Sequence, residues 1–428
     1  MTTKLLSELS TNISSGLTPL RSNPEFWDNG TIPWLKTEQL GEKYIYETNE
    51  HISKAALDKT SIKTFPENSL SIAMYGEGKT RGNLSILKKP MATNQACCNV
   101  VIDPEKADFE YVYYFLKTQY EELRNLSSGV RKNLNSNDIK NYPIRLPESL
   151  DEQKKIANVL KVLDTKIELN NRINSELEAM AKTLYDYWFV QFDFSDENGK
   201  PYKASGGKMV YNDALKREIP DGWDWKAVSS LIEVRDGTHE SPKPAETGQY
   251  LVTSKHLKPS GIDFSDAYLI SQEDFDAVNK RSKVDEGDFL LSMIGTVGLS
   301  QWAMKIEIPY AIKNIGLFKT SQAPEMADYI FAAVTSLHGK AFLQQNQSTG
   351  TSQPYVTLGT LRSIPILIPD ELVFEQFNRK IKPIHKLMYE NTTENQKLAQ
   401  LRDWLLPMLM NGQVTVKPST ESQETLHG

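Results

Sequence analysis

The sequence has very few cysteines and no long run of apolar residues. Its two cysteines, Cys97 and Cys98, are adjacent, and neighbouring cysteines rarely bridge each other. Two ligands cannot close a structural zinc site either, so we expect two reduced thiols in a β-strand. No stretch approaches the roughly 18 consecutive apolar residues of a membrane-spanning helix, and residues 1–30 contain no basic segment followed by an apolar run. The expected location is therefore the cytoplasm, with no membrane partner.

An excess of positive charge is also absent, because 49 Lys and Arg face 55 Asp and Glu, for a net charge of −6. This balance alone argues against a nucleic-acid-binding protein. The acids, however, are unevenly distributed. Residues 79–102, 123–137 and 329–369 contain no Asp or Glu but do contain Lys or Arg. Because such segments attract a polyanion locally, and because they recur at matching places in the two halves, the pattern favours DNA-facing loops.

Catalytic motifs are scarce as well. Residues 73–80 loosely fit a phosphate-binding loop, with Lys79 and Thr80 in the expected positions. A true loop of this kind opens a helix whose N-terminus holds phosphate, whereas residues 81–87 read as a turn and a strand. The matching loop of the second half, residues 295–298, lacks the lysine. We therefore favour a hairpin that offers Lys79 and Arg81 to DNA, with a phosphate-loop nucleotidase as the alternative.

No other site chemistry is indicated. The sequence contains no Asn-Pro-Pro-Tyr or Asp-Pro-Pro-Tyr, the motifs expected for adenine methylation, and its six histidines have no metal-ligand spacing. A nucleophile elbow is also missing. His239 and His256 are candidate base contacts or plain surface residues. We expect no catalytic residue, no metal and no cofactor in this chain.

The clearest positive feature is an internal repeat. Segments of the first half match segments of the second in the same order, each about 220 residues further on. The matched pairs are 4–9 with 226–231, 34–37 with 250–253, 70–76 with 289–295, 109–113 with 327–331, and 142–147 with 364–369. Short β-like runs bounded by Gly, Pro and Asn, and helices near 108–126 and 327–345, predict an α+β unit in each half. The chain is thus a pseudo-two-fold internal repeat of two globular units.

A long helix is predicted after each unit. Apolar residues alternate at spacings of four and three from Ile156 to Trp188, the heptad pattern of a coiled coil, and again from Phe377 to Leu409. Both seams carry two asparagines at their centres, Asn170 and Asn174 in the first and Asn391 and Asn395 in the second. Buried asparagines of this kind tend to fix helix register; otherwise they face solvent. If the helices pair antiparallel, Asn170 faces Asn395 and Asn174 faces Asn391, although the seam itself is compatible with either direction.

Prolines interrupt the second heptad run. Pro383 removes a backbone donor, so it is expected to kink the helix or to mark its start. Pro407 is expected to disturb the last turns.

With the repeat and helices in place, the chain resembles the specificity subunits of type I restriction–modification systems over essentially its whole length. The most specific stretches are residues 146–153 with Ile156, Leu160, Leu163, Asp164 and Ile167, then 197–202, 206–209 and 217–223. The resemblance implies target-recognition domains at 1–147 and 219–369, spacer helices at 148–192 and 370–412, a linker at 193–218 and a disordered tail at 413–428.

The resemblance also implies a function. Each target-recognition domain would read one half of a bipartite, asymmetric site in double-stranded DNA, and the two helices, packed antiparallel, would set the unread gap. Two methyltransferase (modification) subunits would dock on this scaffold and supply S-adenosylmethionine. Restriction (translocase) subunits would bring ATP and Mg. Alternatives are the specificity subunit of a type II system that cuts both sides of its site, and a scaffold that never touches DNA.

Candidate DNA contacts lie where Gly, amide, hydroxyl and basic residues cluster in loops, because Asn and Gln suit adenine edges and Arg and Lys suit guanine and phosphate. The first half offers Lys79, Arg81, Asn83, Asn94, Gln95, Arg131, Lys132 and Asn133. The second half offers Thr296, Gln301, Lys313, Asn314, Ser352, Gln353 and Tyr355.

Overall fold

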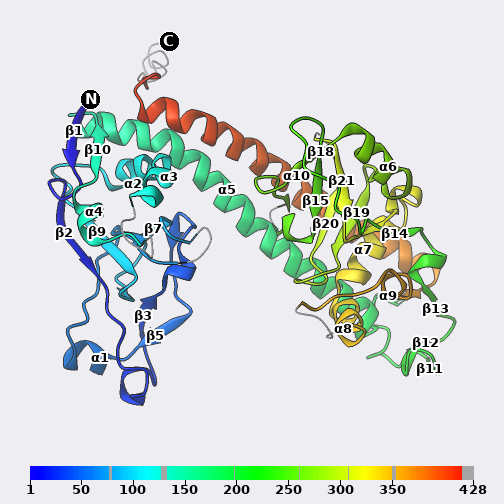
Figure 1. Ribbon diagram of the computed structural model, residues 1–428. Helices are drawn as coiled ribbons and strands as arrows, with labels where there is room; N and C mark the ends of the chain where they lie inside the picture. The colour runs from blue at the N-terminus through cyan, green and yellow to red at the C-terminus, as the bar shows by residue number, and fades with distance from the viewer. Residues whose placement is uncertain are drawn as a thin grey trace, which may run out of the picture. The chain divides into compact units, whose positions relative to one another are not determined.

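The computed structural model describes residues 1–76, 80–126, 133–196, 198–259, 261–306, 308–348 and 353–416. The chain divides into two compact units. Unit 1 consists of Met1–Lys166 together with Lys397–Gly428, and unit 2 consists of Ile167–Gln396. Unit 1 is therefore built from both ends of the chain, whereas unit 2 is one continuous segment (Figure 1).

Unit 1 contains three small sheets. The largest has the order β2-β9-β6-β7-β4, formed by Ser10–Ser15, Cys97–Ile102, Leu70–Ala73, Leu84–Leu87 and Tyr44–Ile45. A second sheet has the order β5-β3-β8, formed by Glu50–Ile52, Ile32–Leu35 and Ala92–Thr93. β1 (Thr2–Leu5) pairs with β10 (Pro143–Leu146). The helices are α1 (Lys54–Lys59), α2 (Phe109–Thr118), α3 (Tyr120–Asn125), α4 (Ser136–Lys140) and the start of α5 (Leu150–Tyr185), with 3-10 turns at Pro24–Phe26 and Thr37–Gln39.

Unit 2 repeats this arrangement. Its main sheet has the order β14-β22-β19-β20, formed by Val234–Asp236, Ile315–Phe318, Asp288–Ser292 and Ser300–Ala303. A second sheet has the order β18-β15-β21, formed by Leu269–Ile270, Gln249–Thr253 and Tyr310–Lys313. Three strand pairs complete it: β13 (Asp224–Ala227) with β23 (Pro365–Ile368), β11 (Met209–Asn212) with β12 (Arg217–Pro220), and β16 (Leu257–Lys258) with β17 (Gly261–Ile262). The helices are α6 (Gln272–Ser282), α7 (Ala327–Thr335), α8 (Leu337–Gln345), α9 (Leu358–Arg362) and α10 (Glu371–Met410), with short helical turns at Asp186–Val190, Val228–Ser230, Ser254–His256 and Thr320–Gln322.

The internal repeat predicted from the sequence is confirmed by strand topology. In each unit a parallel strand pair, β3–β8 or β15–β21, follows the same order along the chain and carries one antiparallel neighbour. In each unit the first strand of the main sheet pairs antiparallel with the strand after that parallel pair, β2 with β9 and β14 with β22. The repeat therefore extends from the sequence to hydrogen-bonding order.

The helices predicted near 108–126 and 327–345 are each divided in two. The first breaks at Gln119, whose backbone leaves the helical region between α2 and α3. The second breaks at Ser336, whose hydroxyl accepts a hydrogen bond from Gly339 N at 3.1 Å and so caps a new helix. A serine that caps a helix start satisfies an otherwise unpaired amide, which explains the break there.

The long helix of the second half is continuous from Glu371 to Met410, so the expectation that Pro383 marks its start is wrong. Proline removes only one backbone donor, the amide that would bond to the carbonyl of Arg379. Phe377 and Ile381, both fully buried just before the proline, hold this part of the helix in place. Packing therefore outweighs the lost hydrogen bond.

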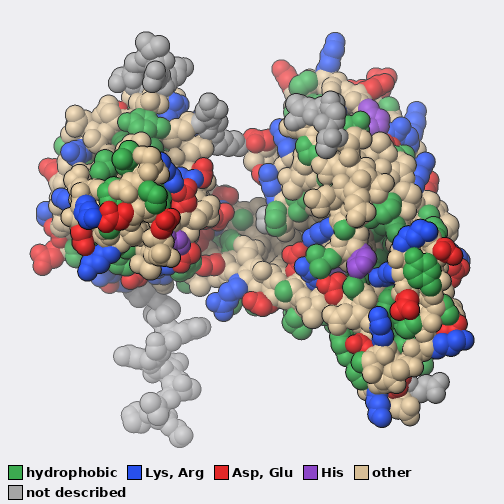
Figure 2. All heavy atoms as spheres, turned by 90° about the horizontal axis from the view of Figure 1, so that it is seen from below, with side chains coloured by type: hydrophobic (Ala, Val, Ile, Leu, Met, Phe, Trp, Pro, Cys, Tyr) green, Lys and Arg blue, Asp and Glu red, His purple; other side chains and the backbone are tan. Residues whose placement is uncertain are grey.

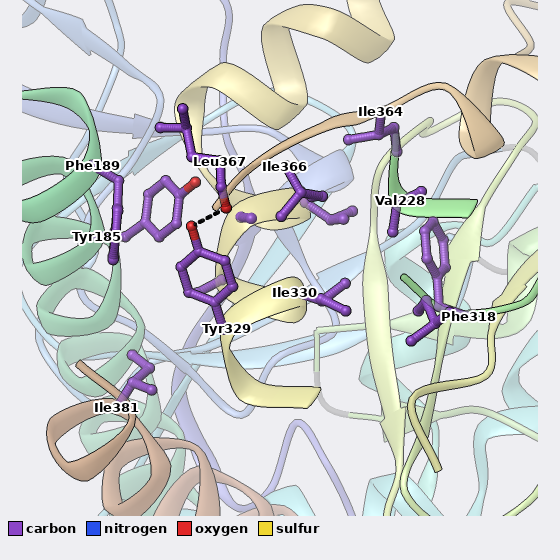
Figure 3. Close-up of a cluster of buried hydrophobic side chains, with 14 of the residues drawn as sticks. Tyr185, Phe189, Val228, Phe318, Tyr329, Ile330, Ile364, Ile366, Leu367 and Ile381 are labelled. Carbon is purple, nitrogen blue, oxygen red and sulfur yellow. Dashed lines mark hydrogen bonds between the residues drawn. The ribbon is translucent and has the colours of Figure 1, made fainter. Parts of the chain in front are cut away.

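Aromatic side chains anchor the long helices in the core of unit 2 (Figure 3). Phe189, directly after α5, packs edge-on against Phe377 of α10, with ring centroids 4.8 Å apart. The hydroxyl of Tyr329 on α7 donates to the carbonyl of Leu367 at 2.7 Å, which satisfies the only polar group of that buried ring (Figure 3). Burying each such ring contributes roughly 1.5–3 kcal/mol, so this cluster fixes both helices onto the unit.

Polar contacts run along the paired helices in antiparallel order. In unit 2, Asn170 donates to Asn395 Oδ1 at 2.9 Å, and Asn391 donates to Asn174 Oδ1 at 2.9 Å. In unit 1, Arg402 of α10 donates to Asp164 of α5 at 2.9 Å. Partner numbers on α10 fall as those on α5 rise, which is the signature of antiparallel packing. The antiparallel pairing of the fold prediction is therefore confirmed.

The C-terminal turns of α10 complete unit 1. Leu409 and Met410 belong to the same buried cluster as Ile156 and Leu160 of α5. In Figure 1 the end of α10 lies next to the N-terminus, and a Cβ built on Gly412 would lie 3.2 Å from Met1 Cε. Among the described residues, no helix is long and apolar enough to cross a membrane.

Candidate nucleic-acid interface

In unit 1, the described candidate residues gather where β6 ends and β9 begins. The turn of the β6–β7 hairpin carries Arg81 and Asn83, and Gly82 N donates to Ala73 O at 2.9 Å. Ala96 accepts from Met74 N at 2.8 Å, which places the Asn94–Gln95 turn beside the same strand end. Leu134 N also donates to Met74 O, so Asn133 lies at this edge too. Lys79, Arg131 and Lys132 lie outside the described residues.

Some of these polar side chains are already hydrogen-bonded to backbone groups of unit 1. The Asn83 amide donates to Leu40 O at 3.2 Å, and Asn94 Oδ1 accepts from Ala96 N at 3.2 Å. Gln95 differs, because it is exposed and its oxygen accepts a hydrogen bond from the Thr18 hydroxyl. Gln95 is thus a held but accessible amide on this edge.

The same edge is assembled in unit 2. β19 pairs with β22 so that Ser292 is opposite Ile315, which puts Asn314 beside the start of the β19–β20 loop that carries Thr296. Gly295 N donates to Pro354 O at 3.0 Å, and this brings Gln353 and Tyr355 to the loop. Lys313 is the last residue of β21, and its ammonium group donates to the Ser241 hydroxyl. Five described candidates from three segments of the chain, Asn314 included, therefore lie at this edge.

The other two second-half candidates differ in place. Gln301 lies within β20, opposite Leu290, and its amide donates to the carbonyl of Lys258. Ser352 lies outside the described residues.

Asn314 is held by a histidine. His239 Nδ1 lies 2.9 Å from Asn314 Oδ1, and His239 Nε2 lies 2.9 Å from Asp236 Oδ2. Asp236 is buried and also pairs with Arg281 at 3.2 Å. Asn314 itself has a φ of 53°, in the left-handed region that few residues other than glycine adopt, asparagine being among those enriched there. The turn is thus fixed by its backbone and by a supported ring.

A basic hollow of about 440 Å³ lies beside this turn. It is lined by Glu233, Arg235, Asp236, Lys280, Arg281, Leu358 and Arg362. Arg281 donates to Gly237 O at 2.8 Å and Arg362 donates to Val234 O at 3.0 Å, so two guanidinium groups are fixed on the backbone of β14 and the glycine after it. Sequence reasoning missed most of this hollow, because Lys280 and Arg281 lie within the acid-rich stretch 263–288 and only the fold brings them to β14.

Charge elsewhere is mixed. Figure 2 shows Lys and Arg side chains interspersed with Asp and Glu on both units in that view. The phosphate-loop alternative gains no support from the described part of the hairpin, because residues 80–83 form a turn that leads directly into strand β7 rather than into a helix. Among the described residues, no group of three or more His, Cys, Asp and Glu is placed to hold a metal ion.

Comparison with known proteins agrees with this architecture. Residues 2–179 match the family model described as the type I restriction modification DNA specificity domain. The chain is 27% identical over 420 residues to the type I restriction enzyme MjaIX specificity subunit of Methanocaldococcus jannaschii, covering 95% of this chain and 91% of that protein. It is 25% identical to the HindI specificity subunit of Haemophilus influenzae, covering 67% and 72% respectively.

The fold has a solved counterpart. The crystal structure of a type I restriction–modification system S subunit from M. genitalium has a TM-score of 0.52 and 16% identity, over 95% of each chain. Mixed α/β domains with two long packed helices are thus a known arrangement. The family consists of recognition subunits that are not themselves catalytic. Residues 2–179 thus match the type I specificity-domain family, and the chain is similar to type I specificity subunits over 95% of its length.

Proposed function

We propose that this chain is a specificity subunit that reads a bipartite, asymmetric site in double-stranded DNA. The target-recognition domain of each repeat would read one half-site. The observation that carries the proposal is that one chain holds two copies of the same strand topology with different residues at the equivalent loop edges. Two unlike readers on one chain recognise a site that need not be a palindrome, in contrast to a two-fold symmetric dimer.

The candidate residues divide by chemistry. Held amides such as Gln95 and Asn314 suit base edges, whereas Lys280 and Lys313 suit phosphate oxygens. The acidic net charge is compatible with this division, because the basic hollow concentrates cations at one edge of unit 2. The partners of the proposal are methyltransferase subunits, which would bind S-adenosylmethionine, and restriction subunits, which would use ATP and Mg. The paired helices α5 and α10 would form the scaffold.

The test is a selection from randomised duplex DNA with the chain co-purified with its methyltransferase subunit. We expect enrichment of two short, unlike motifs at one fixed spacing. Replacing residues 1–147 by those of another family member is expected to change one motif and leave the other. Tight binding without any motif would refute sequence reading, and absence of binding at moderate salt would leave a scaffold that does not contact DNA. Co-purification of cleavage activity that needs ATP translocation would separate the type I assignment from the type II alternative.

A further inference from the structure

One glycine occupies the same place in both repeats. Gly16 follows β2 and Gly237 follows β14. The backbone N–H of each glycine donates to the carbonyl of the first residue of the paired strand, Cys97 O of β9 at 3.2 Å and Ile315 O of β22 at 2.9 Å. A Cβ at Gly16 would lie 2.1 Å from Thr93 O, and a Cβ at Gly237 would lie 2.3 Å from Ile312 O. Any side chain at either position would therefore clash with backbone. The glycine allows the chain to cross tightly over the turn between the two sheets.

The residue two positions after this glycine holds a side-chain amide in each repeat. In unit 1 it is Thr18, whose hydroxyl donates to Gln95 Oε1. In unit 2 it is His239, whose Nδ1 lies 2.9 Å from Asn314 Oδ1. Gln95 and Asn314 occupy the corresponding turn, between β8 and β9 in one unit and between β21 and β22 in the other. Two pairs with no residue type in common thus make the same contact at the same place in the fold.

Each pair leaves hydrogen-bonding capacity on its amide. The contact in each pair uses the amide oxygen, and among the described residues the structure records no acceptor for Gln95 Nε2 or Asn314 Nδ2. An amide oxygen has two lone pairs, so it can accept a second hydrogen bond while the NH₂ group donates. That combination matches N6 and N7 of adenine in the major groove. The held amides therefore present the donor and acceptor that an adenine edge requires.

The two pairs are supported differently. His239 is held from its other nitrogen by Asp236, a buried carboxylate that Arg281 also contacts. In unit 1 the residue before the glycine is Ser15, which is exposed and carries no such carboxylate. Asn314 also keeps a left-handed backbone with a φ of 53°. Asparagine is among the residues that adopt this conformation most readily, so the residue type suits the turn and the backbone helps to fix the direction of its side chain.

We propose that Gln95 and Asn314 are the equivalent base-reading residues of the two repeats, each recognising an adenine in its own half-site, and that Thr18 and His239 are their positioning residues. This inference rests on the proposed bipartite recognition and deepens it. The rest of each loop edge supplies neighbouring contacts, and the difference between the two pairs contributes to the asymmetry of the site.

The test is the same selection from randomised duplex DNA, carried out with the complex of full-length chain and methyltransferase subunit. Gln95→Ala is expected to remove the preference for one base pair in the first half-site, and Asn314→Ala to do so in the second. Discrimination at that position is expected to fall on the order of 10- to 100-fold. Asn12→Ala and Gln272→Ala serve as matched controls, because both are exposed polar residues away from these turns, one in each unit.

The positioning residues are tested by replacement and rescue. Thr18→Val removes the hydroxyl at constant shape and is expected to weaken discrimination at the Gln95 position, whereas Thr18→Ser is expected to retain it. His239→Ala is expected to weaken discrimination at the Asn314 position, and His239→Asn, which keeps a donor near Nδ1, to restore part of it.

The outcomes separate the two levels of the argument. Unchanged motifs in Gln95→Ala and Asn314→Ala, with or without a lower melting temperature, would show that the pairs only stabilise turns and would overturn the inference while leaving bipartite recognition intact. A change in the opposite half-site would overturn it as well. If the wild-type complex itself enriches no motif, the proposed function fails, and the inference fails with it.

Discussion

The asparagine ladder between the two long helices offers a quantitative test of how they pair. Asn170 is 1% exposed and Asn395 is 6% exposed, and the Asn170 amide donates both to Asn395 Oδ1 and to Glu394 Oε2. Replacing Asn170 by Leu leaves the buried oxygen of Asn395 without this donor, while the exposed carboxylate of Glu394 can turn to water. An unsatisfied buried acceptor costs about 1–3 kcal/mol, so Asn170→Leu is expected to lower the free energy of unfolding by that amount.

A double replacement makes the prediction specific to the pair. With Asn170→Leu and Asn395→Leu together, both buried polar groups disappear and two apolar side chains meet. The double variant is therefore expected to lose about 1–2 kcal/mol less than the sum of the two single variants. The assay is urea unfolding of the four proteins, followed by far-ultraviolet circular dichroism. Glu168→Ala, at an exposed position of α5, is the control and is expected to change stability by less than about 0.5 kcal/mol. Strictly additive effects, or an Asn170→Leu variant as stable as wild type, would refute a buried polar contact in the seam.

Three further predictions concern the sites and the units. Burial raises the pKa of the Cys97 and Cys98 thiols to about 12, so almost no thiolate is present at pH 8. A chromogenic disulfide reagent is therefore expected to react with both thiols only when denaturant is added. Fast reaction in native buffer would contradict their burial. Lys280→Ala is expected to weaken binding equally to all sequences and to reduce the slope of log affinity against log salt by about one, measured by fluorescence anisotropy; a changed sequence motif would argue against a phosphate contact. Gly16→Ala forces a Cβ against Thr93 O and is expected to destabilise unit 1 by about 1–3 kcal/mol or more, measured by urea unfolding. The control is Gly199→Ala, whose Cβ would meet no atom within 4 Å. Because Gly199 has a φ of 72°, this control reports the cost of backbone strain alone.

Local patterns made much of the fold predictable. The internal repeat and the heptad spacing can be recognised from the residue order alone, and they predicted two mixed α/β units and a pair of long helices. The helix breaks at Gln119 and Ser336 were not predicted, because a polar residue within an apolar helix pattern is weak evidence for a break. Only the structure shows that the Gln119 backbone leaves the helical region and that the Ser336 hydroxyl caps a new helix. Pro383 misled for the opposite reason, since a local rule about one missing donor was outweighed by the burial of Phe377 and Ile381.

The candidate site was predictable as a set of loops more than as a set of side chains. Composition pointed to the turns that carry Gln95 and Asn314, and strand register brings those turns to equivalent edges. Composition could not show that the Asn83 amide is bonded to Leu40 within unit 1. Composition also gave no reason to select Thr18, because a single hydroxyl residue forms no recognisable sequence motif. Thr18 meets Gln95 only because the chain passes close to Thr93 at Gly16.

The composition of unit 1 from both chain ends has a consequence for synthesis on the ribosome. Residues 1–166 emerge first, but the core they form also contains Leu409 and Met410, and Asp164 of this segment bonds to Arg402. Arg402, Leu409 and Met410 all lie near the end of α10 and are made much later. Unit 2, a continuous segment, has every one of its residues available before that point. Unit 2 is therefore expected to finish folding in the cell before unit 1, although most of unit 1 is made earlier. Until the end of α10 has been made, the buried cluster that contains Ile156 and Leu160 lacks Leu409 and Met410, and this nascent surface is where chaperones would act.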